Sequence, residues 1–300
     1  MKITYLLEDR IPRTLQALVE EHIQKAELDY YKISYSSSDE EIQEAFDNSF
    51  AVLCAPGRYI SPKLYENSRD LKLFQLWSSG YDKFDLVTPR ERGIYVCNNG
   101  GANAVSVAEH TILLMLAQYK NLIDSHKRTV EGRWAGNSHG MDMFMLQGKT
   151  IGIIGLGNIG SEVAKRLNAF GCKIIVYDIL EKNQKDYNFD FRQVTLSEIA
   201  KQSDIVTLHL HSNEKTKNII NSEFFSKMKS SATLINVSRA GLVDQRAFEQ
   251  SLSSKSILGA GLDVYTHEPT SADDPILMHP RVIATPHMAG STVDVYVKAL

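Results

Sequence analysis

The stretch "TIGIIGLGNIGSEVAKRLNAFGCKIIVYD", residues 150–178, constrains the fold of this chain more than any other stretch. An apolar run leads into Gly155, Gly157 and Gly160, which have the spacing G-x-G-x-x-G. An amphipathic segment over residues 161–170 follows, and a second apolar run closes the stretch. A strand, a glycine-rich turn, a helix and a second strand in this order predict a βαβ unit with parallel strands.

The same stretch has the features of a dinucleotide site. Gly155 permits a tight turn, Gly157 lets the backbone approach a pyrophosphate, and Gly160 lets the helix and strand pack closely. The free N–H groups and the dipole of the helix start favour the negative diphosphate. Asp178, at the end of the second strand, would accept hydrogen bonds from the adenosine ribose. The next residues, "ILEK", offer Lys182 but no arginine for a 2′-phosphate, which favours NAD over NADP.

Apolar strand-like runs alternate with amphipathic helical stretches along the rest of the chain, which is typical of an α/β protein. A length of 300 residues indicates about two domains. The pattern predicts a Rossmann doubly wound parallel sheet plus a smaller flavodoxin-like α/β domain. We assign residues 1–99 and 288–300 to the smaller, substrate-binding domain, and residues 100–287 to the dinucleotide-binding domain.

A long helix is expected at the first crossing between these domains, over "NAVSVAEHTILLMLAQYKNLI". Asn103 is a favourable N-cap for it. Residues 112–117 are apolar on every side, so two sides of this helix should be buried, at a domain or subunit interface. The polar stretch "EGRWAGNSHGMD" that follows is expected to form a loop or arm containing Trp134.

Composition excludes several classes of protein. The net charge of −3 argues against a broad nucleic-acid or anionic-membrane surface. The start "MKITYLLEDR" does not read as a signal peptide, and no run approaches the ~18 apolar residues of a membrane span. The three cysteines fit neither a metal spacing nor a disulfide framework. A reducing cytoplasm is therefore the expected location.

Three predicted strands in the second half are followed by residues able to do chemistry, which are Arg239, Glu268 and His287. The carboxyl ends of parallel strands line one crevice, so these side chains can converge. An imidazole can take the hydroxyl proton as hydride leaves carbon, and a neighbouring carboxylate can hold the ring. An arginine can bind a substrate carboxylate and polarise the adjacent carbonyl. His209 and His211 would share a strand face, but no third ligand fits, so no metal is expected.

From about Leu71 onward the chain resembles the NAD-dependent D-isomer-specific 2-hydroxyacid dehydrogenases. The resemblance is carried by "GLGNIG", "NVSRAGLVD", "GLDVYTHEP" and "TPHMAGST", with "SSGYDKFDL" and "NAVSVAEH". It implies that His287 is the general acid–base with Glu268 as its partner, and that Arg239 binds the substrate carboxylate. It also implies a homodimer built around the helix that starts at Asn103.

The resemblance assigns further binding roles. Asp263 would hold the nicotinamide carboxamide, and Asn158 and Ile159 would face the pyrophosphate. Backbone N–H groups around Ser79 and Gly80 would bind the substrate carboxylate. Arg58, which follows a strand in "APGRYISP", is a candidate contact for a distal substrate phosphate or carboxylate.

The expected activity is hydride transfer between NAD(H) and a small D-2-hydroxy acid or its 2-keto acid. D-3-phosphoglycerate is the first candidate substrate, and glyoxylate, hydroxypyruvate and D-lactate remain open. One alternative is an NAD(H)-sensing binding protein of the corepressor type, since such proteins of this fold keep the same residues. Another is a phosphite dehydrogenase-like enzyme, which also uses a Glu–His pair.

Overall fold

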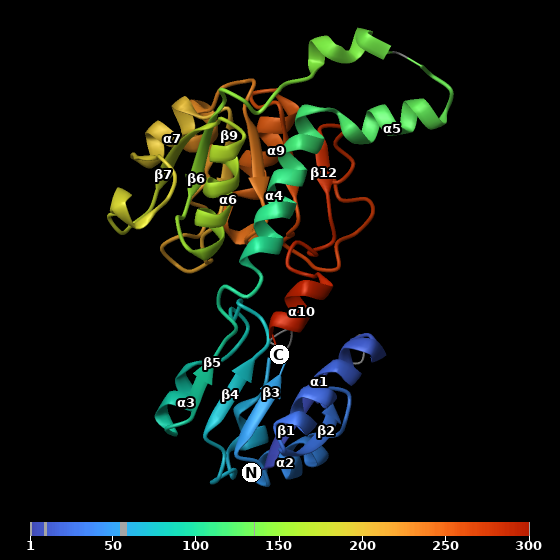
Figure 1. Cartoon of the computed structure of the whole chain (residues 1–300), viewed down its shortest axis with the longest axis vertical. Helices are drawn as coiled ribbons and strands as arrows, with labels where there is room; N and C mark the ends of the chain where they lie inside the picture. The colour runs from blue at the N-terminus through green and yellow to red at the C-terminus, as the bar shows by residue number, and fades with distance from the viewer. Residues whose placement is uncertain (1, 9–10, 55–58, 135, 300) are drawn as a thin grey trace. The chain divides into compact units, whose positions relative to one another are not determined.

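The computed structural model describes residues 2–8, 11–54, 59–134 and 136–299. The chain divides into two compact units (Figure 1). Unit 1 comprises Met1–Asn103 with Ser291–Leu300, and unit 2 comprises Ala104–Gly290. The expected domain boundaries, after residues 99 and 287, lie within a few residues of these limits. No helix in the described part of the chain combines the length and apolar character needed to span a membrane.

Unit 1 is built on a five-stranded parallel sheet with the order β2-β1-β3-β4-β5. This order is the flavodoxin-like one. Alternate residues of β1 point to opposite faces, with Tyr5 among the residues that pack on α1 and Leu6 among those that pack on α2. The elements are β1 (Lys2–Leu7), α1 (Arg13–Lys25), β2 (Asp29–Ser34), α2 (Asp39–Asp47), β3 (Ala51–Cys54), η1 (Pro62–Tyr65), β4 (Leu73–Leu76), α3 (Val87–Glu91), β5 (Tyr95–Cys97) and α10 (Val293–Ala299).

Unit 2 is built on a seven-stranded parallel sheet with the order β12-β11-β10-β9-β6-β7-β8. Starting from β6, this is the Rossmann order with one added strand, and the switch point lies between β6 and β9. The strands are β6 (Thr150–Ile154), β7 (Lys173–Tyr177), β8 (Arg192–Gln193), β9 (Ile205–Leu208), β10 (Thr233–Asn236), β11 (Gly259–Leu262) and β12 (Val282–Ala284).

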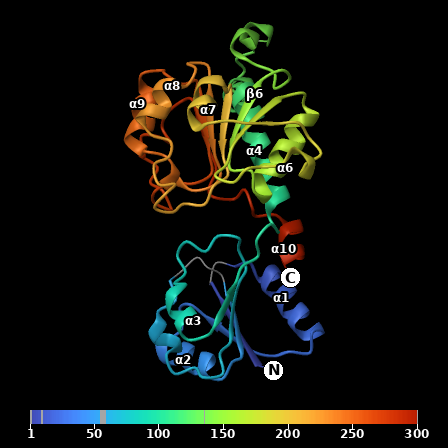
Figure 2. The same ribbon diagram turned by 90° about the vertical axis from the view of Figure 1, so that its left-hand side faces the viewer.

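Helices cover both faces of this sheet (Figure 2). One apolar core lies between the sheet and α4 and α6, and a second lies on the side of α7, α8 and α9. Strand residues such as Ile205 and Val206 are fully buried, as expected for parallel strands covered on both faces. The helical elements are α4 (Ala104–Tyr119), α5 (Leu122–Val130), η2 (Gly136–Asp142), α6 (Asn158–Ala169), η3 (Gln184–Asp186), α7 (Leu196–Gln202), α8 (Ser222–Lys227), η4 (Ala240–Leu242) and α9 (Gln245–Ser253).

The single long helix expected from Asn103 is broken in the structure, so that prediction was wrong in its second half. Helix α4 ends at Tyr119, and Asn121 has a φ of 47° before α5 begins. Asparagine tolerates this left-handed conformation, which redirects the chain. Helix α5 and the following η2 then project from unit 2 as an arm (Figure 1).

The predicted fold class is confirmed by both sheets. Short strands β5 and β8 were not predicted, because neither has an apolar run long enough to be recognised. Tyr95 is largely exposed at the edge of its sheet, and Arg192 and Gln193 form a strand of two residues. Edge pairing, rather than apolar character, therefore defines these two strands.

Candidate active site

The glycine loop after β6 has the geometry that the sequence predicted for it. Gly155 has a φ of 97°, a conformation that other residues rarely adopt. A Cβ on Gly160 would lie 2.0 Å from the carbonyl oxygen of Gly155, so only glycine lets α6 pack this closely. A Cβ on Gly157 would meet no atom within 4 Å, which leaves open space beside the start of α6. Together these features fit a diphosphate at the N-terminus of the helix.

The carboxylate of Asp178 is bonded directly to this loop. Its Oδ2 accepts the Leu156 N–H at 2.8 Å, and its Oδ1 accepts the Leu180 N–H at 3.0 Å. Asp178 thus lies beside the glycine loop at the end of β7, where the ribose of a dinucleotide binds in this fold. Asn158 and Ile159 form the first turn of α6 at the same edge. The roles of these residues in binding stay predictions.

Glu268 and His287, far apart in sequence, form a hydrogen-bonded pair. The distance between His287 Nδ1 and Glu268 Oε2 is 2.7 Å. The second oxygen of Glu268, Oε1, accepts the Tyr265 N–H at 2.9 Å. Because Glu268 holds Nδ1, the other ring nitrogen of His287, Nε2, is the one that can exchange a proton with a bound molecule. The His287 side chain is 47% exposed, so the ring is open to solvent.

The turn that carries His287 is held by the buried carboxylate of Asp263. Asp263 is completely buried, and its Oδ1 accepts hydrogen bonds from Thr285 Oγ1 at 2.6 Å and from Met288 N–H at 3.0 Å. Its Oδ2 accepts the Ala289 N–H at 2.8 Å. These bonds lie on both sides of His287 in the sequence, and the φ of 52° at His287 requires such support from the surrounding structure. Asp263 therefore anchors the residues on both sides of the predicted base.

Helix α4 supports the same turn. His110 Nε2 lies 3.0 Å from Thr285 Oγ1 and 3.8 Å from the Asp263 carboxylate. Ser106 donates from its hydroxyl to the carbonyl oxygen of Ala289 at 2.7 Å. Nothing in the sequence around His110 indicates this partner, because the contact joins residues 175 positions apart.

Arg239 follows β10. The neighbouring strand in the sheet, β11, leads to Glu268. The backbone of Arg239 precedes η4, and its carbonyl oxygen accepts a hydrogen bond from the side chain of Asn236 at 2.9 Å. The guanidinium donates from Nη1 to the Ser238 carbonyl oxygen at 2.7 Å. Arg239 is thus placed at the same carboxyl edge of the sheet as Glu268 and His287, as the sequence predicted from strand ends.

In unit 1, Ser79 and Gly80 follow the end of β4. Ser79 Oγ donates to the carbonyl oxygen of Asn99, and Asn98 Nδ2 donates to the carbonyl oxygen of Ser79 at 2.7 Å. These side-chain bonds fix the segment while leaving the backbone N–H groups of Ser79 and Gly80 without an acceptor among the described residues. That arrangement suits the predicted carboxylate contact. The candidate Arg58 lies outside the described residues.

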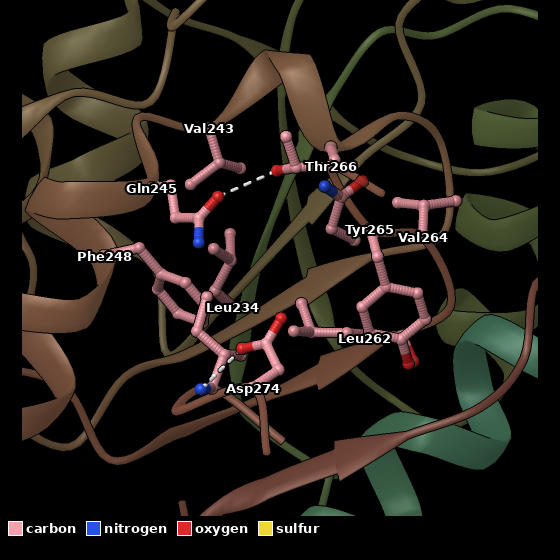
Figure 3. A pocket seen from close by; sticks show the side chains of 12 residues that line it. Leu234, Val243, Gln245, Phe248, Leu262, Val264, Tyr265, Thr266 and Asp274 are labelled. Carbon is pink, nitrogen blue, oxygen red and sulfur yellow. Dashed lines mark hydrogen bonds between the residues drawn. The ribbon is translucent and has the colours of Figure 1, made fainter. Parts of the chain in front are cut away.

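A cavity lies behind the loop that bears Glu268, on the α9 side of the sheet (Figure 3). Tyr265 lines this cavity, and its hydroxyl donates to the Thr285 carbonyl oxygen at 2.9 Å. Burial raises the pKa of Tyr265 to about 12, so the hydroxyl stays a donor. Thr266 also bonds Gln245 at the start of α9 at 2.8 Å. Tyr265 therefore ties Glu268 to the turn of His287, a role that its neighbourhood in "GLDVYTHEP" could have indicated.

His209 lies under the glycine loop, where its carbonyl oxygen packs against Gly155. Its Nε2 is 3.0 Å from Thr207 Oγ1, whereas Nδ1 is buried and has no hydrogen-bond partner among the described residues. Burial lowers the pKa of His209 to about 3, because a charged ring would lose its hydration there. The neutral ring is therefore part of the folded state.

We expect this histidine to make the protein sensitive to acid. The unfolded chain binds the proton near pH 6.5 and the folded chain only near pH 3, so stability falls as pH drops through this window. At pH 5 the loss from this group is about 2 kcal/mol relative to pH 8. Urea unfolding at both pH values should show a smaller loss in His209→Gln than in the wild type. The exposed His126→Gln should behave as wild type, and equal losses in all three proteins would contradict the assignment.

A Rossmann sheet with a G-x-G-x-x-G loop and an acid–base pair at its carboxyl edge defines a class of dinucleotide-binding oxidoreductases. Residues 112–289 match the family model described as D-isomer specific 2-hydroxyacid dehydrogenase, NAD binding domain. The chain belongs to the D-isomer specific 2-hydroxyacid dehydrogenases, as its motifs indicated. It is an NAD-dependent dehydrogenase that acts on the CH–OH group of small 2-hydroxy acids.

Individual relatives support this assignment over nearly the whole chain. A glyoxylate reductase of Korarchaeum cryptofilum is 32% identical over 294 residues, which cover 97% of this chain and 88% of that protein. A D-3-phosphoglycerate dehydrogenase of Archaeoglobus fulgidus is 31% identical over 93% of this chain, which spans 54% of that protein. The structure of D-lactate dehydrogenase from Aquifex aeolicus, complexed with NAD and lactic acid, aligns with a TM-score of 0.84. It is 25% identical, and the alignment covers 99% of this chain and 92% of that one.

Proposed function

We propose that this chain interconverts a small 2-keto acid and its D-2-hydroxy acid, with His287 as the general acid–base. The observation that carries the proposal is the 2.7 Å hydrogen bond between His287 Nδ1 and the Glu268 carboxylate, on a turn anchored by buried Asp263. This arrangement leaves Nε2 of the base open to a substrate oxygen. Glu268 orients the ring, and Arg239, placed after the neighbouring strand, binds the substrate carboxylate.

The cofactor residues are proposed on the same basis. The close packing at Gly155 and Gly160, the open space at Gly157 and the start of α6 at Asn158 and Ile159 fit a diphosphate. Asp178 would receive the ribose hydroxyls, and Asp263 stays a candidate for the nicotinamide carboxamide.

When bound, NADH supplies the hydride. His287 then delivers a proton from Nε2 to the keto oxygen, while Arg239 polarises that carbonyl.

Within this class we propose glyoxylate or hydroxypyruvate as the substrate. A glyoxylate reductase of Korarchaeum cryptofilum and a hydroxypyruvate reductase of Thermotoga maritima are 32% and 37% identical to this chain, and the D-3-phosphoglycerate dehydrogenase of Archaeoglobus fulgidus is 31% identical. D-3-phosphoglycerate, the first candidate from the sequence, needs a contact for its phosphate. Arg58 was proposed for that contact and lies outside the described residues. Ser79 and Gly80 would serve the carboxylate that all these substrates share.

The test is a panel of substrates, with each reaction monitored through the absorbance of NADH. Purified protein is mixed with NADH and, separately, glyoxylate, hydroxypyruvate, 3-phosphohydroxypyruvate and pyruvate, and kcat/KM is compared. We expect turnover of at least one acid, with glyoxylate or hydroxypyruvate best. Tight NADH binding without turnover of any acid would overturn the enzyme proposal and support a nucleotide-sensing protein. Oxidation of phosphite with NAD in place of these activities would support the phosphite dehydrogenase alternative.

We further propose that the arm of unit 2 forms a homodimer interface. Helix α5 has no buried residue, although it carries Leu122, Ile123 and Val130, and Trp134 beyond it is 84% exposed. Met141, in η2, is 90% exposed. Apolar side chains gathered on a projecting segment indicate a surface that a second copy covers. Light scattering after size-exclusion chromatography should give twice the chain mass of 33.7 kDa, and a monomer at micromolar concentration would contradict it.

A further inference from the structure

The ammonium group of Lys182 lies on the carboxylate proposed for the ribose. Its Nζ is 3.3 Å from Asp178 Oδ2, and the two side chains are only 15% and 11% exposed. By contrast, the surface pair of Lys25 and Glu21 has side chains 65% and 56% exposed. Solvent screens such surface pairs strongly, whereas a pair withdrawn from water keeps its interaction. The ammonium of Lys182, in the loop that follows Asp178, therefore offsets the negative charge of Asp178.

The loop is fixed in this shape by one side chain from β8. Gln193 Nε2 donates to the carbonyl oxygens of Asp178 at 3.1 Å and Leu180 at 3.0 Å. Gln193 Oε1 accepts the Lys182 N–H at 2.9 Å. These three bonds order the backbone over residues 178–182 by contacts within the protein. Little conformational entropy remains to be lost when Lys182 engages a ligand at this position.

Of the two neighbouring cations, Lys182 and Arg192, Lys182 is the one that lies at the proposed ribose site. The nearby Arg192 of β8 is directed to helix α7, where Nη1 lies 3.9 Å from Glu198 and Nη2 donates to Gln202 at 2.5 Å. Asp178 is the carboxylate within ion-pair distance of Lys182 among the described residues. An ammonium has three N–H donors, so Lys182 can bind a further acceptor while it remains beside Asp178.

A carboxylate at this strand end normally excludes NADP, because it repels the 2′-phosphate on the adenosine ribose. Here the adjacent ammonium removes much of that repulsion and can itself pair with the phosphate. We propose that Lys182 makes this ribose site accept a 2′-phosphate, so that the dehydrogenase uses NADPH as well as NADH. The inference rests on the proposed function, because it takes Asp178 as the ribose residue.

The test compares kcat/KM for NADPH and NADH with one keto acid in the wild type and two variants. Wild type should use NADPH measurably, and Lys182→Met should lower the NADPH-to-NADH ratio by about tenfold or more. Part of this change should be a lower KM for NADH, because Asp178 loses a competitor for its oxygens. Lys185→Met, at an exposed lysine of the same loop, should leave the ratio unchanged. An unchanged ratio in Lys182→Met, or no NADPH use by wild type, would overturn the proposal.

A binding titration separates this proposal from the activity itself. The fluorescence of NADPH and NADH reports their dissociation constants without turnover. Lys182→Met should weaken NADPH binding by about tenfold, and wild-type NADPH binding should weaken more with salt than NADH binding does. If no keto acid is turned over but this pattern holds, the proposed function fails and the Lys182 assignment stands. If both nucleotides bind Lys182→Met as they bind wild type, the Lys182 assignment fails.

Discussion

His287→Asn should lower kcat by about 10²- to 10⁴-fold at pH 7, which is the range that a positioned general acid contributes. Asparagine is the suitable replacement because His287 has a φ of 52°, and asparagine adopts this conformation readily. Alanine would add backbone strain to the loss of the imidazole. Steady-state kinetics with the best keto acid measures the effect, and a fluorescence titration should give an NADH dissociation constant close to the wild-type value.

The matched control is His267→Asn, at an exposed histidine next to Glu268. It removes an imidazole from the same loop without touching the pair, so its kcat should stay within about twofold of wild type. The kcat of Glu268→Gln should lie between those of His287→Asn and His267→Asn. A glutamine can still form a hydrogen bond to the ring, but it cannot stabilise the protonated ring by charge. A His287→Asn protein with the full rate would refute the role of this residue.

The pairing of Glu268 and His287 was predictable because of a general property of parallel sheets. Each residue follows a strand, β11 and β12 are neighbours, and their carboxyl ends meet at one edge. The glycine loop was predictable for a similar reason, since the close approach at Gly160 leaves no room for a Cβ. Local sequence specifies these features, so one sequence is enough to find them.

Other features of the site depend on contacts that the sequence does not encode locally. His110 meets Thr285 from a helix 175 positions away, and nothing in "AEHT" indicates that partner. The break at Asn121 was missed because the apolar pattern continues across it, while the backbone turns through a left-handed residue. Lys182 was visible as the nearest base, but its burial against Asp178 was not.

Asp263→Ala should be the most damaging substitution for stability in unit 2. It would leave the N–H groups of Met288 and Ala289 without their acceptor, and the Thr285 hydroxyl with only the longer bond of 3.3 Å to the Leu262 carbonyl oxygen. Losing a buried hydrogen-bonded carboxylate of this kind costs about 3 kcal/mol of unfolding free energy. Because the turn would also shift, kcat/KM should fall by about 10²-fold. Urea unfolding and steady-state kinetics measure the two effects.

The resemblance to the family implies that Asp263 holds the nicotinamide carboxamide, and the structure adds an anchoring role, so the experiment must separate the two. A residue that only contacts the cofactor would leave the free energy of unfolding of the nucleotide-free protein unchanged. An anchor lowers it with no nucleotide present. Asn221→Ala, which removes the N-cap of α8, is the matched control, since it should cost about 1 kcal/mol while kcat/KM is kept. Wild-type stability in Asp263→Ala would therefore rule out the anchor and leave the cofactor contact as the reason for any lost activity.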